Sequence, residues 1–353
     1  MISVIIPTFN KAEYLKLTLA SLVNQSFSTF EIVIVNNGGN DDTSGIVASF
    51  NHLLDINYVE LPKNVGRPEA RNIGVKHSRG DILIFNDDDR ILDENFVMEH
   101  KNTLSIQDEK TLVFGNRQKI LSIWKAGNIG IHKEEFINYA RKNRSLVRSF
   151  QNKKEEKLFD TNDIINNFDE IITKFQIQKR KDVFMAIVDT FKDRLDSCYF
   201  LWIAGSSANV SCFKSFFEKV GGYDEYYVRW GLEDLDLFYR CYLEGSHFKF
   251  NKKACSYHQV HLRGETEHED LYNNLIYFCE KFRTEEIKLF LDWRNGDISI
   301  EEANEKIHRL KQDKSFDSSK KVYKNFEKEL SCLKSRTGLL NDVKHEKVLG
   351  GNE

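Results

Sequence analysis

The sequence predicts an α/β fold in which a mostly parallel sheet is flanked by helices, with a helical insertion and a helical C-terminal extension. Over residues 1–115, strand-like runs alternate with segments of helical periodicity, and the runs are apolar on both faces. Strands of this kind are typical of parallel sheets covered by helices. Polar clusters follow three of the runs, and the carboxyl ends of parallel strands form the edge where ligands bind.

The elements of this first part follow one another in a regular order. Residues 12–25 and 68–77 carry apolar side chains at helical spacing, and a further helical segment precedes the third strand. Gly80 ends the second of these helices. Strands are predicted at residues 3–6, 30–35, 56–61 and 81–85. The polar clusters that directly follow strands are Thr8–Asn10, Asn36–Gly39 and Asp87–Asp89.

The remaining chain divides into three stretches by composition. Residues 116–197 mix charged residues with apolar residues at helical intervals, which predicts a helical insertion. Residues 198–268 return to aromatic and glycine residues with strand-like pieces, so they are expected to complete the sheet domain begun by residues 1–115. Residues 269–353 are again helical and charged, which predicts a C-terminal extension.

Composition excludes several classes of protein. The 353 residues include 51 Lys and Arg against 54 Asp and Glu, and a net charge of −3 argues against a dedicated nucleic-acid binder. No apolar run approaches the roughly 18 residues of a membrane span. The first residues lack the features of a signal peptide, and six scattered cysteines favour reduced thiols over disulfides or a zinc cluster. We expect a cytoplasmic protein, with a peripheral position at the inner membrane face and a homo-oligomer both left open.

The strongest single feature is the run of three carboxylates, Asp87–Asp89, at the end of an apolar strand. Adjacent carboxylates repel one another unless a positive charge lies among them. A divalent cation with oxygen ligands would relieve the repulsion, and such cations commonly bridge phosphate oxygens. A solvated acidic turn is the alternative for an isolated triplet.

A series of motifs in chain order resembles the family 2 glycosyltransferases of GT-A fold, in the branch shared by bacterial polysaccharide synthases. The resemblance covers residues 1–115 and about 200–262, and it implies a nucleotide-sugar-binding half followed by an acceptor-binding half. It is specific to the fold and to sugar transfer but not to one sugar. The motifs that carry it are Ser3–Asn10, Leu22–Gln25, Phe30–Val35, Asn64–Gly66, Ala70–Asn72 with Gly74, Gly80–Asp89, Gly221–Glu225 and Trp230–Asp234.

The resemblance implies a donor site on the first half. Asp89, in the position of a DXD motif, would bind the metal together with His258, and an imidazole ligand favours Mn²⁺ over Mg²⁺ without excluding Mg²⁺. His261 is the weaker candidate. Asn36 and Asn37 replace the usual pair of aspartates, so UDP-sugar is the favoured donor while thymidine and guanosine nucleotides stay open. The residues expected to bind the nucleotide are Pro7, Thr8, Asn10, Asn37, Arg71, Asp87 and Asp88.

The resemblance also implies roles on the acceptor side. Asp234 would act as the base that takes the proton of the acceptor hydroxyl, with Glu233 holding the acceptor, and a related retaining branch has Asn in place of Asp234, which favours inversion. Trp230 would stack on a sugar. Gly205 and Ser206 would line the donor sugar, although small residues also mark tight packing. Arg263 would lie on a lid over the phosphates.

Two other functions are alternatives to a hexosyltransferase. A nucleotidyltransferase would need a glycine-rich loop after the first strand, and Pro7–Asn10 contains no glycine. A non-catalytic carbohydrate-binding or scaffold protein on a degenerate GT-A fold would not need the intact Asp89, His258 and Asp234. The acceptor stays open between a glycan, a lipid-linked sugar and a peptide.

Overall fold

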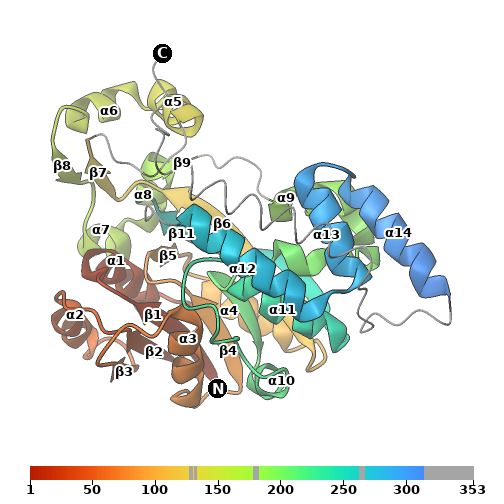
Figure 1. The fold of residues 1–353 in the computed structure, drawn as a ribbon. Helices are drawn as coiled ribbons and strands as arrows, with labels where there is room; N and C mark the ends of the chain where they lie inside the picture. The colour runs from red at the N-terminus through yellow and green to blue at the C-terminus, as the bar shows by residue number, and fades with distance from the viewer. Residues whose placement is uncertain (127–129, 131–132, 178–182, 262–266, 314–353) are drawn as a thin grey trace.

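The structure is a computed structural model that describes residues 1–126, 130, 133–177, 183–261 and 267–313 (Figure 1). Its centre is a nine-stranded sheet, and a separate two-stranded ribbon lies beside it. The sheet strands are β1 (Ile2–Thr8), β2 (Phe30–Asn36), β3 (Ile56–Glu60), β4 (Ile82–Asn86), β5 (Arg90–Leu92), β6 (Thr111–Ile120), β9 (Gln176–Ile177), β10 (Asn209–Phe213) and β11 (His247–Gln259). The ribbon pairs β7 (Ile123–Lys125) with β8 (Glu155–Lys157).

The sheet is mixed rather than mostly parallel. Its order is β3-β2-β1-β4-β10-β6-β11-β5, with β9 added to β6. The first four strands are mutually parallel, as is the pair of β6 and β11. By contrast, β10 runs antiparallel to both β4 and β6, and β5 runs antiparallel to β11. The parallel prediction is therefore confirmed for the first part of the chain, and β10 joins the second part to it in the opposite direction.

The apolar character of the first strands follows from burial on both faces. In β1, Ile5 belongs to one hydrophobic core, and its neighbours Val4 and Ile6 belong to a second core across the sheet. Helix α1 (Ala12–Val23) contributes to the second core, while α3 (Arg67–Lys76) packs on the face of Ile5. Helices α2 (Thr43–Phe50) and α4 (Phe96–Leu104) complete the covering of this half.

The insertion is mainly helical but also adds strands. Strand β6 crosses residue 115, so the first half of the sheet domain extends to Ile120. Within the insertion, β9 joins the main sheet, and α7 packs against α1. Its helical elements among the described residues are α5 (Lys133–Lys142), α6 (Arg144–Phe150), α7 (Thr161–Asn166), α8 (Phe168–Phe175), α9 (Val183–Phe191) and the short 3₁₀ helix η1 (Lys192–Ser197).

The C-terminal helices share a core with the second half of the sheet domain. Trp202, in the 3₁₀ helix η2 (Leu201–Ala204), is fully buried and contacts the rings of Tyr239, Phe278 and Phe290. These rings come from α11 (Glu233–Leu243), α12 (Glu267–Phe282) and α13 (Glu285–Asn295), which Figure 1 shows beside one another. Helices α10 (Lys214–Lys219) and α14 (Ile300–Gln312) complete the set.

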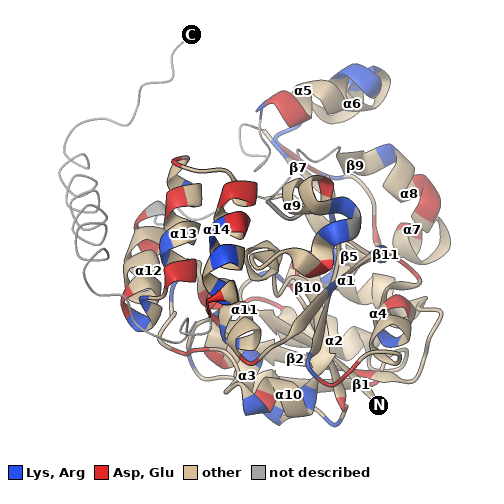
Figure 2. Ribbon diagram, turned by 90° about the vertical axis from the view of Figure 1, so that its right-hand side faces the viewer, with Lys and Arg blue, Asp and Glu red and all other residues tan. Residues whose placement is uncertain are grey.

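The outer helices carry charges of both signs. Figure 2 shows acidic and basic residues interspersed along α13 and α14. Among the described residues, none of the helices combines the length and the apolar character that crossing a bilayer would require.

Candidate active site

The carboxyl ends of β1, β2 and β4 meet at one edge of the sheet, as the sequence predicted. A cavity of about 290 Å³ lies there. Parallel strands place their carboxyl ends together, so residues distant in the chain become neighbours. Among the residues expected to bind a nucleotide, those that line this cavity are Pro7, Thr8, Asn37, Asp87 and Asp88.

Two asparagines at this edge have most of their polar atoms committed to loop structure. The Asn37 side chain accepts a hydrogen bond from the backbone N–H of Val65 at 2.9 Å and donates to the carbonyl of Gly66 at 3.2 Å. Asn10 has a φ of 52° and accepts from the N–H of Asn40 at 2.8 Å. Asn37 therefore shapes one wall of the cavity, while Asn10 holds a neighbouring loop and does not line the cavity.

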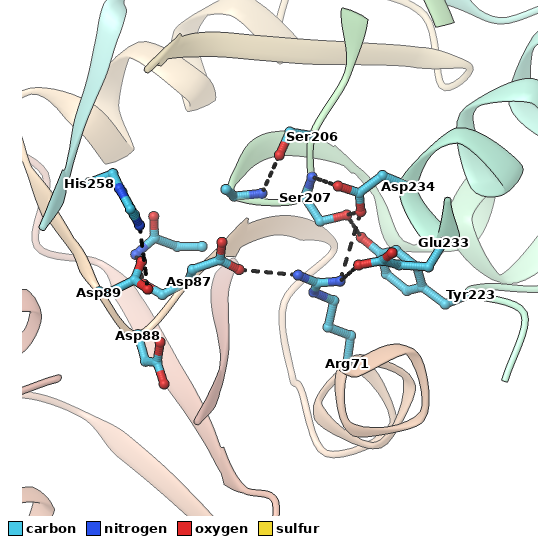
Figure 3. Close-up of polar contacts among 12 residues, drawn as sticks. Arg71, Asp87, Asp88, Asp89, Ser206, Ser207, Tyr223, Glu233, Asp234 and His258 are labelled. Carbon is cyan, nitrogen blue, oxygen red and sulfur yellow. Dashed lines mark hydrogen bonds and ion pairs between the residues drawn. The ribbon is translucent and has the colours of Figure 1, made fainter. Parts of the chain in front are cut away.

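Arg71 lies at the centre of a buried group of carboxylates rather than in the smaller cavity. It is only 2% exposed, and its guanidinium lies 3.1 Å from Asp87 and 3.3 Å from Glu233. Its Nη1 also lies 3.8 Å from Asp234, and the ring of Tyr223 packs against it at 5.3 Å. Figure 3 shows Arg71 between the aspartate triplet and the Glu-Asp pair. Arg71 therefore balances charge between the two groups, and it lines the larger cavity but not the smaller one. The nucleobase contact that the sequence suggested stays a prediction.

Asp89 lies beside two histidines, His258 near the end of β11 and His261 just after the strand. Its Oδ2 lies 3.7 Å from His258 Nε2 and 2.9 Å from His261 Nε2. The nearest ligand atoms of these three residues all lie within 4.8 Å of one another. Lys11 reaches the same point, with its Nζ 2.5 Å from Asp89 Oδ2 and 2.9 Å from His261 Nε2. The lysine ammonium thus compensates the charge of Asp89.

The electrostatics of the triplet differ from one carboxylate to the next. Burial alone would raise the pKa of Asp89, but Lys11 and the two histidines hold it well below its usual range. Burial raises the pKa of Asp88 to about 6, with only partial compensation by Lys11. Burial also lowers the pKa of His258 to about 3, against the pull of Asp89, so its imidazole is neutral. A neutral imidazole is the form that binds metals.

The Asp89–His258–His261 cluster fits a divalent transition metal. One carboxylate and two imidazoles form a donor set that Mn²⁺ accepts, and imidazole favours such ions over Mg²⁺. Asp89 Oδ1 is buried and has no hydrogen-bond partner among the described residues, so it is available as a ligand atom. His261, the weaker candidate from the sequence, lies closer to Asp89 than His258 does.

The second group of carboxylates is set by a tight turn before α11. Leu232 adopts a left-handed conformation with φ 70°, and the helix then begins at Glu233. Conformations of this kind in a non-glycine residue are costly and cluster at functional sites. Asn274 of α12 supports the turn by donating to the carbonyl of Gly231 at 2.8 Å. The turn thus fixes the position of Glu233 and Asp234 at the start of the helix.

The two carboxylates of this turn have different environments. Asp234 accepts a hydrogen bond from the backbone N–H of Ser207 at 3.1 Å and another from the Ser207 hydroxyl. Its side chain is 19% exposed, whereas that of Glu233 is 8% exposed. Burial, followed by repulsion from Asp234, raises the pKa of Glu233. Asp234 is therefore the more accessible of the two, and Ser207 orients it.

One larger cavity joins the two groups. It has a volume of about 660 Å³ and is lined by Asp89 and His258 on one side and by Glu233 and Asp234 on the other. Trp230 lines both this cavity and the smaller one, and so do Lys11, Arg67, Asp87 and Asp89. The sheet edge and the start of α11 therefore face one continuous space.

Comparison of the sequence with known protein families gives two matches. The family described as "Glycosyl transferase family 2" matches residues 3–168, and the one described as "N-terminal domain of galactosyltransferase" matches residues 201–262. The chain thus matches the family 2 glycosyltransferases over residues 3–168. It is therefore an enzyme of the transferase class. The two matches divide at the insertion, and together they contain every residue of the two carboxylate groups.

Curated relatives of this glycosyltransferase are glycosyltransferases of different lengths. YfnE of Bacillus subtilis, an uncharacterized glycosyltransferase, is 29% identical over 79% of this chain and 70% of its own. Chondroitin synthase of Escherichia coli is 27% identical over 73% of this chain, and hyaluronan synthase of Pasteurella multocida is 28% identical over 73%. The chain spans only 34% and 24% of the length of these two synthases.

Solved structures share the fold. The crystal structure of S. aureus TarS 1-349 in complex with UDP aligns with a TM-score of 0.50 at 15% identity, covering 84% of this chain and 72% of that one. The GT-A architecture predicted for this glycosyltransferase is thus confirmed, with its helical insertion and C-terminal helices.

Gly205 is a packing residue and not part of the cavity lining. A Cβ atom at this position would lie 2.4 Å from Phe238 and 2.6 Å from Phe114, both inside the core. Close packing, the alternative that small residues allow, accounts for this glycine. Its neighbour Ser206 does line the larger cavity. Arg263, expected on a lid, lies outside the described residues.

Three further residues of the site were missed by sequence reasoning. Lys11 and Arg67 line both cavities, and Ser207 orients Asp234. Lys11 could have been recognised from the sequence, because it is a cation directly after the first polar cluster, Thr8–Asn10. Arg67 follows a family motif that ends at Gly66. Nothing in the sequence distinguished Ser207 from Ser206, because the two are adjacent serines in one turn.

Proposed function

We propose that this glycosyltransferase moves a sugar from a nucleotide diphosphate sugar to an acceptor hydroxyl, with a divalent metal and with inversion at the transferred carbon. The observation that carries the proposal is the continuous cavity that joins the Asp89 cluster to Glu233 and Asp234. A donor and an acceptor that occupied its two sides would meet in the middle.

UDP-sugar is the favoured donor. The smaller cavity offers Thr8, Asn37 and Asp87 at the strand ends, where nucleotides bind in sheets of this kind. Lys11 and Arg67 are placed to face the diphosphate, since both line the space shared by the two cavities. TarS, which has the same fold, was solved with UDP and with UDP-GlcNAc, and this supports uridine over other bases.

Asp89, His258 and His261 would hold the metal, for which we favour Mn²⁺. When bound, the ion supplies positive charge that stabilises the leaving diphosphate. The chain's own cations make a parallel contribution, because Lys11 lies within 3.6 Å of carboxylate oxygens of both Asp88 and Asp89. Arg71 keeps the carboxylates on its two sides compensated, so that donor and acceptor can approach them.

Asp234 is the proposed base. Its carboxylate accepts from the backbone N–H and the hydroxyl of Ser207, which orient it, and its exposure to the cavity leaves it accessible to an acceptor hydroxyl. General base catalysis by a positioned carboxylate contributes about 10²–10⁴-fold. Glu233 would hold the acceptor, and Trp230 would stack on a sugar at the junction of the two cavities. A base across the cavity from the departing diphosphate gives direct displacement, hence inversion.

The acceptor is proposed to be a glycan or a lipid-linked sugar, with a peptide as a further candidate. The names of the relatives include chondroitin synthase and hyaluronan synthase, which supports a glycan.

A screen of nucleotide sugars tests the proposal. We expect one or more UDP-sugars to be hydrolysed slowly with Mn²⁺, and the release of UDP to stop in excess EDTA. Asp89→Asn should lower the release at least about tenfold, because it removes the carboxylate of the metal cluster. Ser49→Ala, on the exposed face of α2, is the matched control and should retain the rate. A rate that EDTA leaves unchanged would contradict the metal dependence.

A further inference from the structure

Arg90, directly after the aspartate triplet, is a buried cation that the proposed chemistry does not use. Its side chain lines the larger cavity, and the residue is 9% exposed. Its Nη1 donates to the hydroxyl of Ser256 at 3.2 Å, while its Nε has no hydrogen-bond partner among the described residues. No carboxylate in the described part of the chain forms an ion pair with it. Arg90 attracts the Asp87 carboxylate electrostatically, and a buried guanidinium without a paired carboxylate gains from a further counter-charge.

The register of the sheet places two further cations on the same face. Arg90 of β5 pairs with His258 of β11, and His258 pairs with Lys119 of β6. Two residues along, Ser256 pairs with Arg117. Residues directly opposite one another, and those two apart along a strand, share a face. Arg90, Lys119 and Arg117 therefore form a row held by three strands, and all three line the larger cavity.

Helix α13 also lines the larger cavity. It presents Trp293 and Arg294, both partly exposed. Arg294 lies against the ring of Tyr272 at 5.7 Å, and it makes no ion pair with a described carboxylate. In the row itself, Lys119 is paired with Glu135 at 2.6 Å. Arg117 donates to the carbonyl of Ala204 at 3.2 Å. Arginines bind carboxylates and phosphates through paired hydrogen bonds.

These cations are separate from those expected to face the donor diphosphate. Lys11 and Arg67 line both cavities, whereas Arg90, Arg117 and Arg294 line only the larger one. The larger cavity also contains Asp234. The three arginines thus line the cavity that contains the proposed base, as does Trp293, on whose ring a sugar can stack.

We propose that the acceptor is an anionic sugar, whose carboxylate or phosphate lies against Arg90, Arg117 and Arg294 while its hydroxyl faces Asp234. The inference rests on the proposed function and names the substrate class of the same site. The site carboxylates Glu233 and Asp234 would repel an anionic acceptor that lacked such a counter-charge. The row holds the negative group away from them and so also sets which hydroxyl reaches the base.

The test uses the full chain saturated with UDP and Mn²⁺, titrated calorimetrically with three matched disaccharides. They end in glucuronic acid, glucose 6-phosphate or glucose, with the same linkage to N-acetylglucosamine. We expect at least one charged probe to bind about tenfold or more tightly than the neutral one. The advantage should shrink in 0.5 M salt, about the level where screening is strong. The carboxylate and phosphate arms distinguish the two sources of charge.

Two variants locate the effect. Arg294→Gln should remove most of the preference for the charged probe and leave the affinity for UDP unchanged. Arg309→Gln, on the exposed side of α14 where it pairs with Glu305 at 3.6 Å, should change neither. Equal binding of all three probes, or binding of none of them while UDP binds, would overturn the inference. A loss of UDP affinity in Arg294→Gln would overturn it too, since the cation would then serve the donor. Failure of UDP itself to bind would instead count against the proposed function.

Discussion

Asp234→Asn is expected to lower the rate of sugar transfer to an acceptor by about 10²–10⁴-fold, the contribution of a general base. The asparagine oxygen can still accept the backbone N–H of Ser207, so the side chain keeps its position and loses only its basicity. The affinity for UDP should stay within about twofold, because Asp234 lies outside the smaller cavity. Initial rates with a true acceptor and a UDP titration measure the two effects.

Two variants serve as controls for this loss. Glu233→Gln should mainly raise the KM for the acceptor, because Glu233 is expected to hold the acceptor rather than take its proton. Glu244→Gln, an exposed residue just after the same helix, should leave kcat and KM unchanged. Full turnover in Asp234→Asn would remove this residue from the role of base. A larger loss of kcat in Glu233→Gln than in Asp234→Asn would assign that role to Glu233.

Arg71→Met is expected to lower the free energy of unfolding by about 3–5 kcal/mol, the usual cost of removing one partner of a buried ion pair. The substitution keeps much of the side-chain volume but leaves Asp87 and Glu233 buried without their shared cation. Repulsion between the two carboxylate groups then adds to the desolvation of each. Urea unfolding at pH 7, followed by circular dichroism, measures the change in stability.

The controls for Arg71 separate charge from shape. Arg71→Lys should cost less than Arg71→Met, because it keeps the charge but loses the fork that reaches Asp87 and Glu233 together. Lys153→Met breaks an exposed ion pair with Glu156 and should cost less than about 1 kcal/mol. An unfolding free energy for Arg71→Met within about 1 kcal/mol of the parent would show that the central position of Arg71 is not needed to compensate the carboxylates.

The first half of the fold was predictable because strands buried on both faces are apolar at almost every position. Strands such as β1 and β4 are apolar throughout, and the boundaries expected for them differ from the structure by only a few residues. Strand β10 lacks this uniformly apolar pattern. Its Asn209 and Ser211 are buried polar residues, and they are accommodated because the ring of His100 hydrogen-bonds to both. His100 lies more than a hundred positions away in the chain, so the sequence around β10 does not show this pairing. The antiparallel centre of the sheet was therefore not predicted.

The residues of the candidate site also fall into those that the sequence predicted and those that it did not. The strand-end rule predicted the neighbours Thr8, Asn37 and Asp87, which line one cavity. The family motif pointed to Asp234, which lines the larger cavity and whose role as base stays a prediction. Residues whose surroundings depend on long-range packing were less predictable. Arg71 pairs with a carboxylate 162 positions further along the chain, so the sequence around it does not show its role. Gly205 was expected near the donor because a small residue allows either a ligand or an aromatic ring to approach the backbone closely. In the structure, the ring of Phe238 packs against Gly205.

The central claim is that the Asp89 cluster couples a metal to the nucleotide, and a calorimetric titration of UDP with and without Mn²⁺ tests it most directly. We expect UDP to bind at one site per chain with Mn²⁺ and at least about tenfold more weakly in EDTA. In His261→Ala the Mn²⁺ dependence should largely disappear, because the histidine nearest to Asp89 is lost. UDP binding of equal strength with Mn²⁺ and with EDTA would contradict the account.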